Sequence, residues 1–387
     1  MTAAAVAEPI LLTLPAHFAH VTDPRVNRRR RHLLLDVLVL ALCAMLAGAE
    51  GWADLAEYGR RKESFLRTFL TLPGGIPHAD TFRRILSALC PQQLLTGVQN
   101  WVMTVAENLD GKVLAIDGKT LRGAFDAAAG RSPFHLVSAW VAESHLLLGQ
   151  LQVEEKSNEI PAVPKLLDII DVEGATVTLD AMGCQKDIAE KIIEKKADYV
   201  LRLRGNHGTL HHEVATFWAD AQADGFRDVP VSFHETFDGG EHGRSEVRRV
   251  WTTPCVEGMA DLAAWKGLRS LILVESERSE GDKPATHEQR FYLSSLPGTD
   301  AQRAGYVVRT HWSVENSLHW QLDVAFGDDR CRVRTDHGPE NLSLLRKLAL
   351  MMLRRETVIC KRGLAIKRKS VGWDDSYLLH VLQAQNQ

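Results

Sequence analysis

The sequence predicts a mixed α/β protein with a helical N-terminal region, a sheet of five strands with helices, and a β-rich insertion. Three observations support this prediction. Apolar residues recur at helical spacing up to residue 108, short apolar runs alternate with helical segments over 109–219, and alternating residues with glycine-rich turns fill 220–297. The length of 387 residues is enough for two domains, or for one large domain with an insertion.

The first 108 residues divide into a patternless start and a helical part. Residues 1–22 are expected to form a loose arm, and residues 23–108 a helical domain. Five arginines between Arg25 and Arg31 serve either as a solvated flank or as a phosphate-contacting arm. A helix over 52–70, the break P-G-G-I-P and a helix that starts near Arg83 and Arg84 resemble a helix-turn-helix unit, although many helical bundles share this order.

The sheet follows from residue 112 onwards. Strands are predicted over 112–117, 135–142, 145–153, 175–180 and 199–204, with helices over 157–170 and 185–196 between the later strands. Asp117 and Asp180 each stand at the carboxyl end of a strand. If these two strands are parallel neighbours, both carboxylates lie at the edge of the sheet where ligand sites gather.

A third acid, Glu315, lies in a segment that is predicted to be one helix over 306–326. Glu315 flanks a stripe of apolar residues four positions apart, and Asn316, His319 and Trp320 crowd it. An acid at the margin of a buried face is costly unless a partner compensates its charge. Three carboxylates suit divalent cations that hold an attacking and a leaving oxygen at phosphorus. Strand-end aspartates also often cap loops, so a structural role stays open at this point.

Basic residues accompany the acids. Lys119 and Arg122 follow Asp117, and a strand after Phe326 would point Arg330, Arg332 and Arg334 to one side, toward a nucleic-acid backbone. A last long helix is predicted over 341–355. Residues 361–387 are expected to form a basic tail, since residues 342–369 hold nine Lys or Arg and one acid.

Composition and targeting signals restrict the cellular setting. The net charge is −3, so a nucleic-acid surface must come from local patches. The six cysteines form no C-x-x-C pair, and no secretory signal starts the chain. The most apolar run, 33–49, contains Asp36 and is too short for a membrane span. These features favour a reduced cytoplasm and no membrane partner.

Seven motifs, in one order along nearly the whole chain, resemble the DDE transposases of bacterial insertion sequences, in the H-repeat-associated (ISAs-type) branch. They are A-I-D-G-K-T-L-R-G, E-K-S-N-E-I-P-A-V-P, T-L-D-A-M-G-C-Q, Y-V-L-R-L-R-G-N, E-H-G-R-S-E-V-R, Y-L-S-S-L and H-W-S-V-E-N-S-L-H-W-Q-L-D-V-A-F. The resemblance runs from D-P-R at Asp23 to the C-terminal V-G-W-D-D-S-Y-L.

The resemblance implies an RNase H-like DDE catalytic domain over 109–219 and 298–360, a β-rich insertion over 220–297, and a domain over 23–108 that binds DNA ends. It implies that Asp117, Asp180 and Glu315 are the catalytic residues and hold two Mg²⁺ or Mn²⁺ ions. Asp117 would be the bridging ligand.

The resemblance also implies a DNA partner. The DNA would be the terminal inverted repeats and a target, bound by a homodimer in the cytoplasm, at the nucleoid of a bacterium. The expected DNA- or phosphate-binding residues are Lys119, Arg122, Arg204, Asn206, His242, Arg244, Asn316, Arg330, Arg332 and Arg334. Two alternatives are a catalytically silent or repurposed DNA-binding relative and a stand-alone RNase H-like nuclease.

Overall fold

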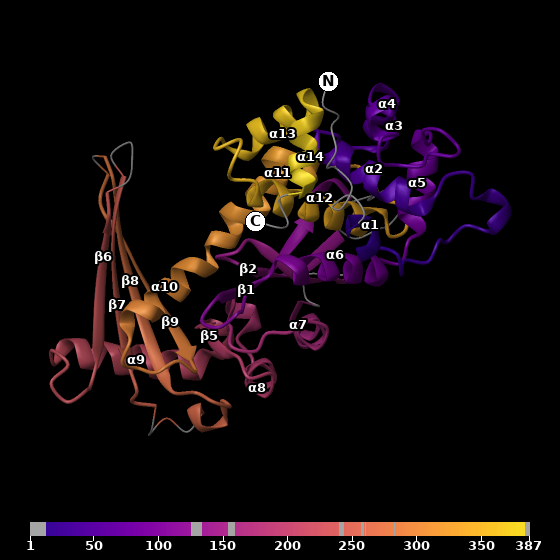
Figure 1. Cartoon of the computed structure of the whole chain (residues 1–387). Coiled ribbons are helices and arrows are strands. Elements are labelled where there is room, and N and C mark those ends of the chain that lie inside the picture. The colour runs from indigo at the N-terminus through magenta and orange to yellow at the C-terminus, as the bar shows by residue number, and fades with distance from the viewer. Residues whose placement is uncertain are drawn as a thin grey trace.

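A computed structural model describes residues 13–124, 134–153, 159–239, 244–256, 259, 261–281 and 283–383. Its centre is one mixed sheet with the strand order β3-β2-β1-β4-β5-β9-β8-β7-β6 (Figure 1). The strands are β1 Val113–Leu121, β2 Phe134–Val141, β3 Leu146–Val153, β4 Thr176–Leu179, β5 Asp198–Leu203, β6 Ser232–Asp238, β7 Arg244–Thr253, β8 Ser270–Glu280 and β9 Thr286–Ser294. The predicted mixed α/β class is confirmed, and the arrangement is consistent with an RNase H-like fold.

The five predicted strands of the core sheet are present as β1 to β5, and four strands from the predicted β-rich insertion bring the sheet to nine. β1, β4 and β5 are parallel neighbours, whereas every other pair is antiparallel. The four strands of the insertion extend the same sheet, because β9 pairs with β5 in the register Val200 to Ser294 and Leu203 to Phe291. The long strands β6 to β9 stand at the left of Figure 1, away from the helical region.

Helices cover both faces of the sheet. On one face lie α7 Glu159–Asp168, α8 Lys186–Glu194 and α9 Gly208–Ala223. On the other face α10 Ala301–His311 packs across β1, β4, β5, β6, β7 and β8. Alternation along β5 explains both layers: Val200 packs with Val307 and Val308 of α10, while its neighbours Tyr199 and Leu201 belong to the larger core.

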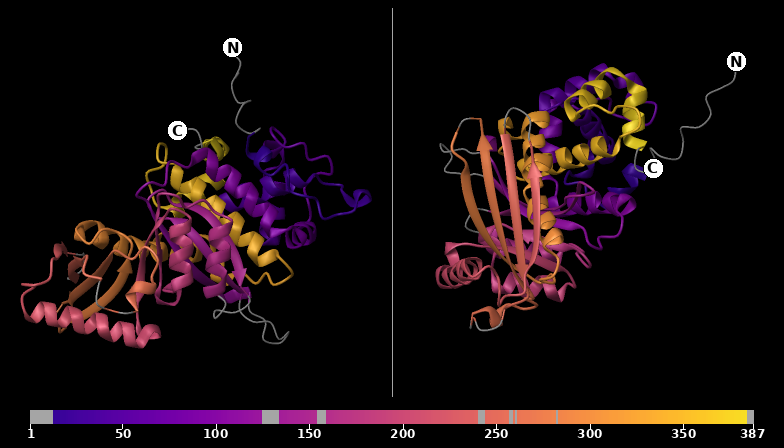
Figure 2. Two further views of the ribbon diagram at one scale, coloured as in Figure 1. Left: turned by 90° about the horizontal axis from the view of Figure 1, so that it is seen from below. Right: turned by 90° about the vertical axis from the view of Figure 1, so that its left-hand side faces the viewer.

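The helical region at one end of the sheet combines both ends of the chain (Figure 2). Its helices are α1 Thr13–His17, α2 Leu34–Leu46, α3 Trp52–Arg61, α4 Glu63–Leu66, α5 Ala79–Ala88, α6 Pro91–Val105, α12 Gly338–Arg355, α13 Leu364–Trp373 and α14 Asp375–Gln383. The long helix α12 joins the region to the sheet, since it packs on α2, α5, α6 and β3.

Residues 13–22 and 361–383, the described parts of the two terminal regions, contain more structure than the sequence predicts. Within the expected arm 1–22, Leu14 and Phe18 are buried, and Phe18 packs where a Cβ on Gly97 would stand. The expected basic tail forms α13 and α14, in which Val371 and Leu378 are fully buried. The expected tail folds into helices because its apolar residues recur at helical spacing and are buried on one side, while its charged residues lie on the exposed side.

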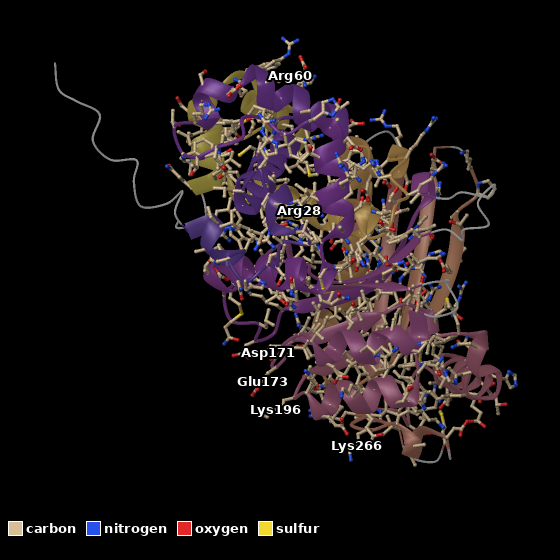
Figure 3. The ribbon with its side chains drawn as sticks, turned by 90° about the vertical axis from the view of Figure 1, so that its right-hand side faces the viewer. Arg28, Arg60, Asp171, Glu173, Lys196 and Lys266 are labelled. Carbon is tan, nitrogen blue, oxygen red and sulfur yellow. The ribbon has the colours of Figure 1, made fainter. Side chains whose placement is uncertain are left out.

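Charged side chains mark the two ends of the molecule. Figure 3 shows Arg28 and Arg60 on the helical region, and Asp171, Glu173, Lys196 and Lys266 toward the opposite end. Within the arginine run, Arg25 is held by Asp23 at 2.7 Å, whereas Arg28 is exposed. In the part of the chain that the structure describes, no helix has both the length and the apolar character that crossing a membrane requires.

Candidate active site

Asp117 and Asp180 lie beside each other at the ends of β1 and β4. The parallel register pairs Val113 with Thr176 and Ala115 with Thr178, and two residues further along each chain stand Asp117 and Asp180. Both residues line the same small cleft. The expectation that the two strands are parallel neighbours is therefore confirmed.

Backbone groups orient both aspartates. Asp180 Oδ1 accepts hydrogen bonds from the backbone N–H groups of Met182 at 2.9 Å and Gly183 at 3.3 Å, which caps the turn after β4. Asp117 Oδ1 accepts from the Gly118 N–H at 2.9 Å. Each carboxylate is thus held in one orientation at the edge of the sheet.

Glu315 reaches this edge through a helix that is not uniform. The predicted helix 306–326 is divided into α10, a π-helical turn Glu315–His319, and α11 Trp320–Phe326. The Trp320 N–H donates to the Glu315 carbonyl, five residues back. Helices with such single wide turns often carry functional residues at the turn. Helix α10 is anchored to β4 by His311, whose Nδ1 lies 3.0 Å from Thr178 Oγ1.

A histidine completes the cluster. The ligand atoms of Asp117, Glu315 and His319 all lie within 4.8 Å of one another. His319 Nδ1 is 3.1 Å from Glu315 Oε2 and 3.6 Å from Asp117 Oδ2. The sequence analysis placed His319 near Glu315 without giving it a role. The signal was its spacing of four residues from Glu315, which puts the two side chains on one helical face.

Burial and neighbouring charges shift the pKa values of these acids. Burial raises the pKa of Asp117, His319 opposes that shift, and the negative charges of Asp180 and Glu315 add to it. The hydrogen bond from His319 holds the pKa of Glu315 below its usual range. Burial lowers the pKa of His311 to about 4, so this anchor is neutral at pH 7.

The cluster fits a hard divalent cation such as Mg²⁺. Carboxylate oxygens are the ligands that this ion takes. The negative charge of Glu315 raises the pKa of Asp117, and a cation bound to both carboxylates would compensate this repulsion. Asp117, Glu315 and His319 are close enough to one another to hold the ion, and Asp180, which lines the same cleft as Asp117, would add a further carboxylate.

Lys119 does not lie where a phosphate contact was expected. Its side chain is 8% exposed, and Nζ lies 2.5 Å from Asp323 Oδ1 and 3.4 Å from the His319 carbonyl oxygen. Lys119 follows Asp117 by two residues, so alternation directs it to the same face, beneath α11. Arg122 is exposed, with Nε 3.8 Å from Asp329.

The prediction of a strand after Phe326, which would have aligned Arg330, Arg332 and Arg334, is wrong. Gly327, with φ 63°, ends α11, and a 3-10 helix over Asp328–Arg330 follows. Arg330 pairs with Glu50 at 3.2 Å, Arg334 Nε donates to the Gly123 carbonyl at 3.4 Å, and Arg332 is exposed. The three guanidinium groups therefore have different surroundings.

Four other expected DNA-binding residues lie within the described part of the chain or at its margin, and only Asn206 and Asn316 adjoin segments that carry the acids. Asn206 Nδ2 donates to the Ala181 carbonyl at 2.9 Å, which joins the loop after β5 to the loop after β4. Arg204 in that loop is exposed, as is Asn316 beside Glu315. His242 lies outside the described residues. Arg244 begins β7, where its backbone pairs with that of Glu280.

Comparison with known proteins finds related sequences over most of the chain. Residues 15–102 match the family model DDE_Tnp_1-associated, and residues 108–352 match the model Transposase DDE domain. "H repeat-associated putative transposase YhhI" of Escherichia coli K12 is 36% identical over 378 residues, which cover 96% of this chain and 98% of that protein. "Putative transposase YncI" of Escherichia coli O157:H7 is 36% identical over 94% of this chain and 92% of its own length. "Uncharacterized protein in dhlA 3'region" of Xanthobacter autotrophicus is 39% identical over 72% of this chain and 92% of its own length.

Proposed function

Because the chain belongs to the DDE transposase family, we propose that it is the transposase of a bacterial insertion sequence. Its substrates are the terminal inverted repeats of the element and a target DNA. The observation that supports the proposal is that Asp117 on β1 lines one cleft with Asp180 of β4 and also lies close to Glu315 of the π-helical turn.

Each acid has a defined part in the proposed reaction. Asp117, which lines one cleft with Asp180 and lies close to Glu315, would be a ligand of the Mg²⁺ or Mn²⁺ ions together with these two acids. When bound, such ions lower the pKa of the attacking oxygen and neutralise the charge on the leaving oxygen. His319 positions Glu315, since a proton on Nδ1 is donated to Glu315 Oε2.

The proposed chemistry has two displacements at phosphorus. In the first, a water oxygen bonds to the phosphorus at the element's end, the bond to the 3′-oxygen breaks, and that oxygen takes up a proton. In the second, the freed 3′-hydroxyl loses its proton as it bonds to a target phosphorus, and the target's own 3′-oxygen leaves. Arg204, which is exposed at the end of β5, and Asn316, which is exposed next to Glu315 in the chain, are proposed to orient the DNA backbone.

The proposal also assigns roles to the larger parts of the chain. Residues 23–108 bind the ends of the element, and residues 109–219 with 298–360 form the catalytic domain, while 220–297 extend its sheet. Two chains act together on paired ends, because both ends must be joined to one target.

The test uses purified full-length protein, a labelled DNA fragment that carries the element's end, and Mg²⁺ or Mn²⁺. The wild type is compared with Glu315→Ala. Cleavage at the end and joining to target DNA by the wild type alone is the expected result. Binding without cleavage by both proteins would instead favour a silent DNA-binding relative, and cleavage without joining would favour a nuclease.

A further inference from the structure

Helix α5 lies between two surface grooves. The first has a volume of about 580 Å³ and is bordered by the segment 24–32, by the loop before α5, and by α5 itself through residues that include Arg84. The second has a volume of about 500 Å³ and lies between Arg83 of α5, the start of α3 and the segment 330–335. Arg83 and Arg84 follow each other in the chain, so α5 presents one arginine to each groove.

Both grooves carry positive charge. The described residues that line the first groove include Arg25, Arg31 and Arg84 and no acid. Those that line the second include four arginines and one acid, Glu50. A groove between α6 and the segment 169–173 has the opposite character, since four acids and no Lys or Arg are among its described lining residues. The net charge of the whole chain is −3, so positive charge is concentrated beside α5, where it favours a polyanionic partner.

The first groove is held in shape by contacts between its basic segment and the loop before α5. A Cβ at Gly74 would stand 2.5 Å from the carbonyl oxygen of Arg31, so glycine at this position allows the two backbones to approach closely. His32 Nδ1 lies 3.1 Å from the carbonyl oxygen of Gly75. The Arg31 side chain is nevertheless exposed. This part of the arginine run is therefore fixed beside α5 as folded surface.

The second groove joins α5 to the part of the chain that carries the acids. Asn341 of α12 is fully buried, and its Nδ2 donates to the Leu86 carbonyl of α5 at 2.8 Å. The segment 330–335 also contacts the turn after β1, where Arg334 Nε donates to the Gly123 carbonyl at 3.4 Å. Helix α5 thus has a fixed position relative to β1, which carries Asp117.

Helices α3 and α5 carry the same arrangement of charges in different surroundings. In each helix, one acid pairs at 2.5–2.7 Å with the arginines three and four residues further along: Glu57 with Arg60 and Arg61, and Asp80 with Arg83 and Arg84. Exposed pairs of this kind contribute little to stability. Arg60 and Arg61 are not among the residues that line the two basic grooves, whereas Arg83 and Arg84 are. The two helices therefore allow the surroundings to be tested while the local chemistry is held constant.

We propose that α5 reads the sequence of the terminal repeats, with Arg83 and Arg84 directed to base edges in the major groove of the DNA. This proposal rests on the function proposed above and assigns end recognition to one helix within residues 23–108. A helix in the major groove has a phosphate backbone on each side, and the two basic grooves beside α5 match that arrangement. Arginine suits the base edges, because two of its N–H groups can bind O6 and N7 of one guanine. Arg31 in the first groove and Arg332 in the second are phosphate contacts.

Fluorescence anisotropy of the purified full-length protein tests the proposal with two labelled duplexes, one that carries the element's end and one with the same bases in shuffled order. The double variant Arg83→Gln with Arg84→Gln should reduce the ratio of the two affinities about tenfold or more, since it removes the base contacts. Arg60→Gln with Arg61→Gln is the matched control on α3 and should keep the wild-type ratio. Arg31→Gln should weaken binding of both duplexes by a similar factor and leave the ratio unchanged.

Thermal unfolding identifies any misfolded variant. If the double variant on α5 is misfolded, Arg84→Gln alone carries the test, at a side chain that is 66% exposed. A reduced ratio in the folded α5 variants with an unchanged ratio in the α3 control supports the proposal. An equal fall in the α3 control would overturn it, because a general loss of charge would then account for the effect.

The same assay separates this proposal from the function on which it rests. Preference of the wild type for the end duplex, kept in the folded α5 variants, would overturn the role of α5 and leave the proposed function intact. Equal binding of both duplexes by the wild type would also overturn the role of α5. Cleavage of the end duplex by the wild type in Mg²⁺ then decides whether the proposed function stands.

Discussion

Lys119 on β1 and Asp323 on α11 form an ion pair, with Nζ 2.5 Å from Oδ1, although 204 residues separate them in the chain. The same ammonium group donates to the carbonyl oxygen of His319. Lys119 therefore ties the strand that carries Asp117 to the helical segment that carries Glu315. The buried ammonium group of Lys119 therefore helps to hold the acids in position and is not directed to solvent.

Lys119→Met should lower the free energy of unfolding by about 1–3 kcal/mol, because the partly buried carboxylate of Asp323 then has lost its ion pair with Lys119. Chemical denaturation of Lys119→Met, Asp323→Asn and the double variant measures the coupling. Strictly additive losses would show that the two side chains do not interact in solution.

His319→Ala should reduce DNA cleavage by about 10–100-fold while DNA affinity is retained, because Glu315 loses the hydrogen bond that orients it. Cleavage rates and binding curves on one labelled DNA end give both quantities. His212→Ala, an exposed histidine on α9, is the control. Equal cleavage rates for wild type and His319→Ala would contradict the positioning role.

Asp328 and Arg346 form a buried ion pair at 2.5 Å, and their side chains are 0% and 2% exposed. Asp328→Asn should lower the free energy of unfolding by about 3–5 kcal/mol, because it leaves the guanidinium charge uncompensated in the core. The exposed pair Glu57 and Arg60 is the comparison, and Glu57→Gln should cost less than about 1 kcal/mol. Denaturant midpoints measure both, and similar losses would refute the contrast.

Lys347 should make stability depend on pH. It is fully buried on α12, where Nζ donates to Ser138 Oγ at 2.8 Å and Gln150 Oε1 at 2.5 Å. Burial lowers its pKa to about 7, against about 10.4 in an unfolded chain. Between these values the unfolded state binds more protons, so the free energy of unfolding rises with pH. This stabilisation is complete above the unfolded pKa and is lost as pH falls through about 7.

Comparison with Lys347→Met isolates that effect. From pH 7 to pH 9 the free energy of unfolding of the wild type should rise by about 2 kcal/mol relative to that of Lys347→Met. Urea denaturation at each pH provides the two curves. Parallel curves would mean that Lys347 stays protonated in the folded protein.

DNA binding should depend on salt through exposed arginines. Arg204→Gln and Arg332→Gln should each weaken binding on all sequences and reduce the slope of log K against log salt by about 1. Lys196→Gln, at the far end of the molecule in Figure 3, should leave the slope unchanged. Fluorescence anisotropy across a salt series measures the slopes, and unchanged slopes in both arginine variants would exclude them as phosphate contacts.

The sequence by itself determined the α/β class, the strands that end at Asp117 and Asp180, and the apolar stripe beside Glu315, because these features depend on local periodicity and on strand ends. Only the tertiary structure decided that the insertion extends one nine-stranded sheet, that α13 and α14 pack on the helical region, and that Lys119 lies under α11. It also decided that His319, from a segment distant in the chain, lies beside Asp117. Periodicity states which residues share a face, whereas contacts between distant segments depend on register, helix packing and the space left by residues such as Gly118.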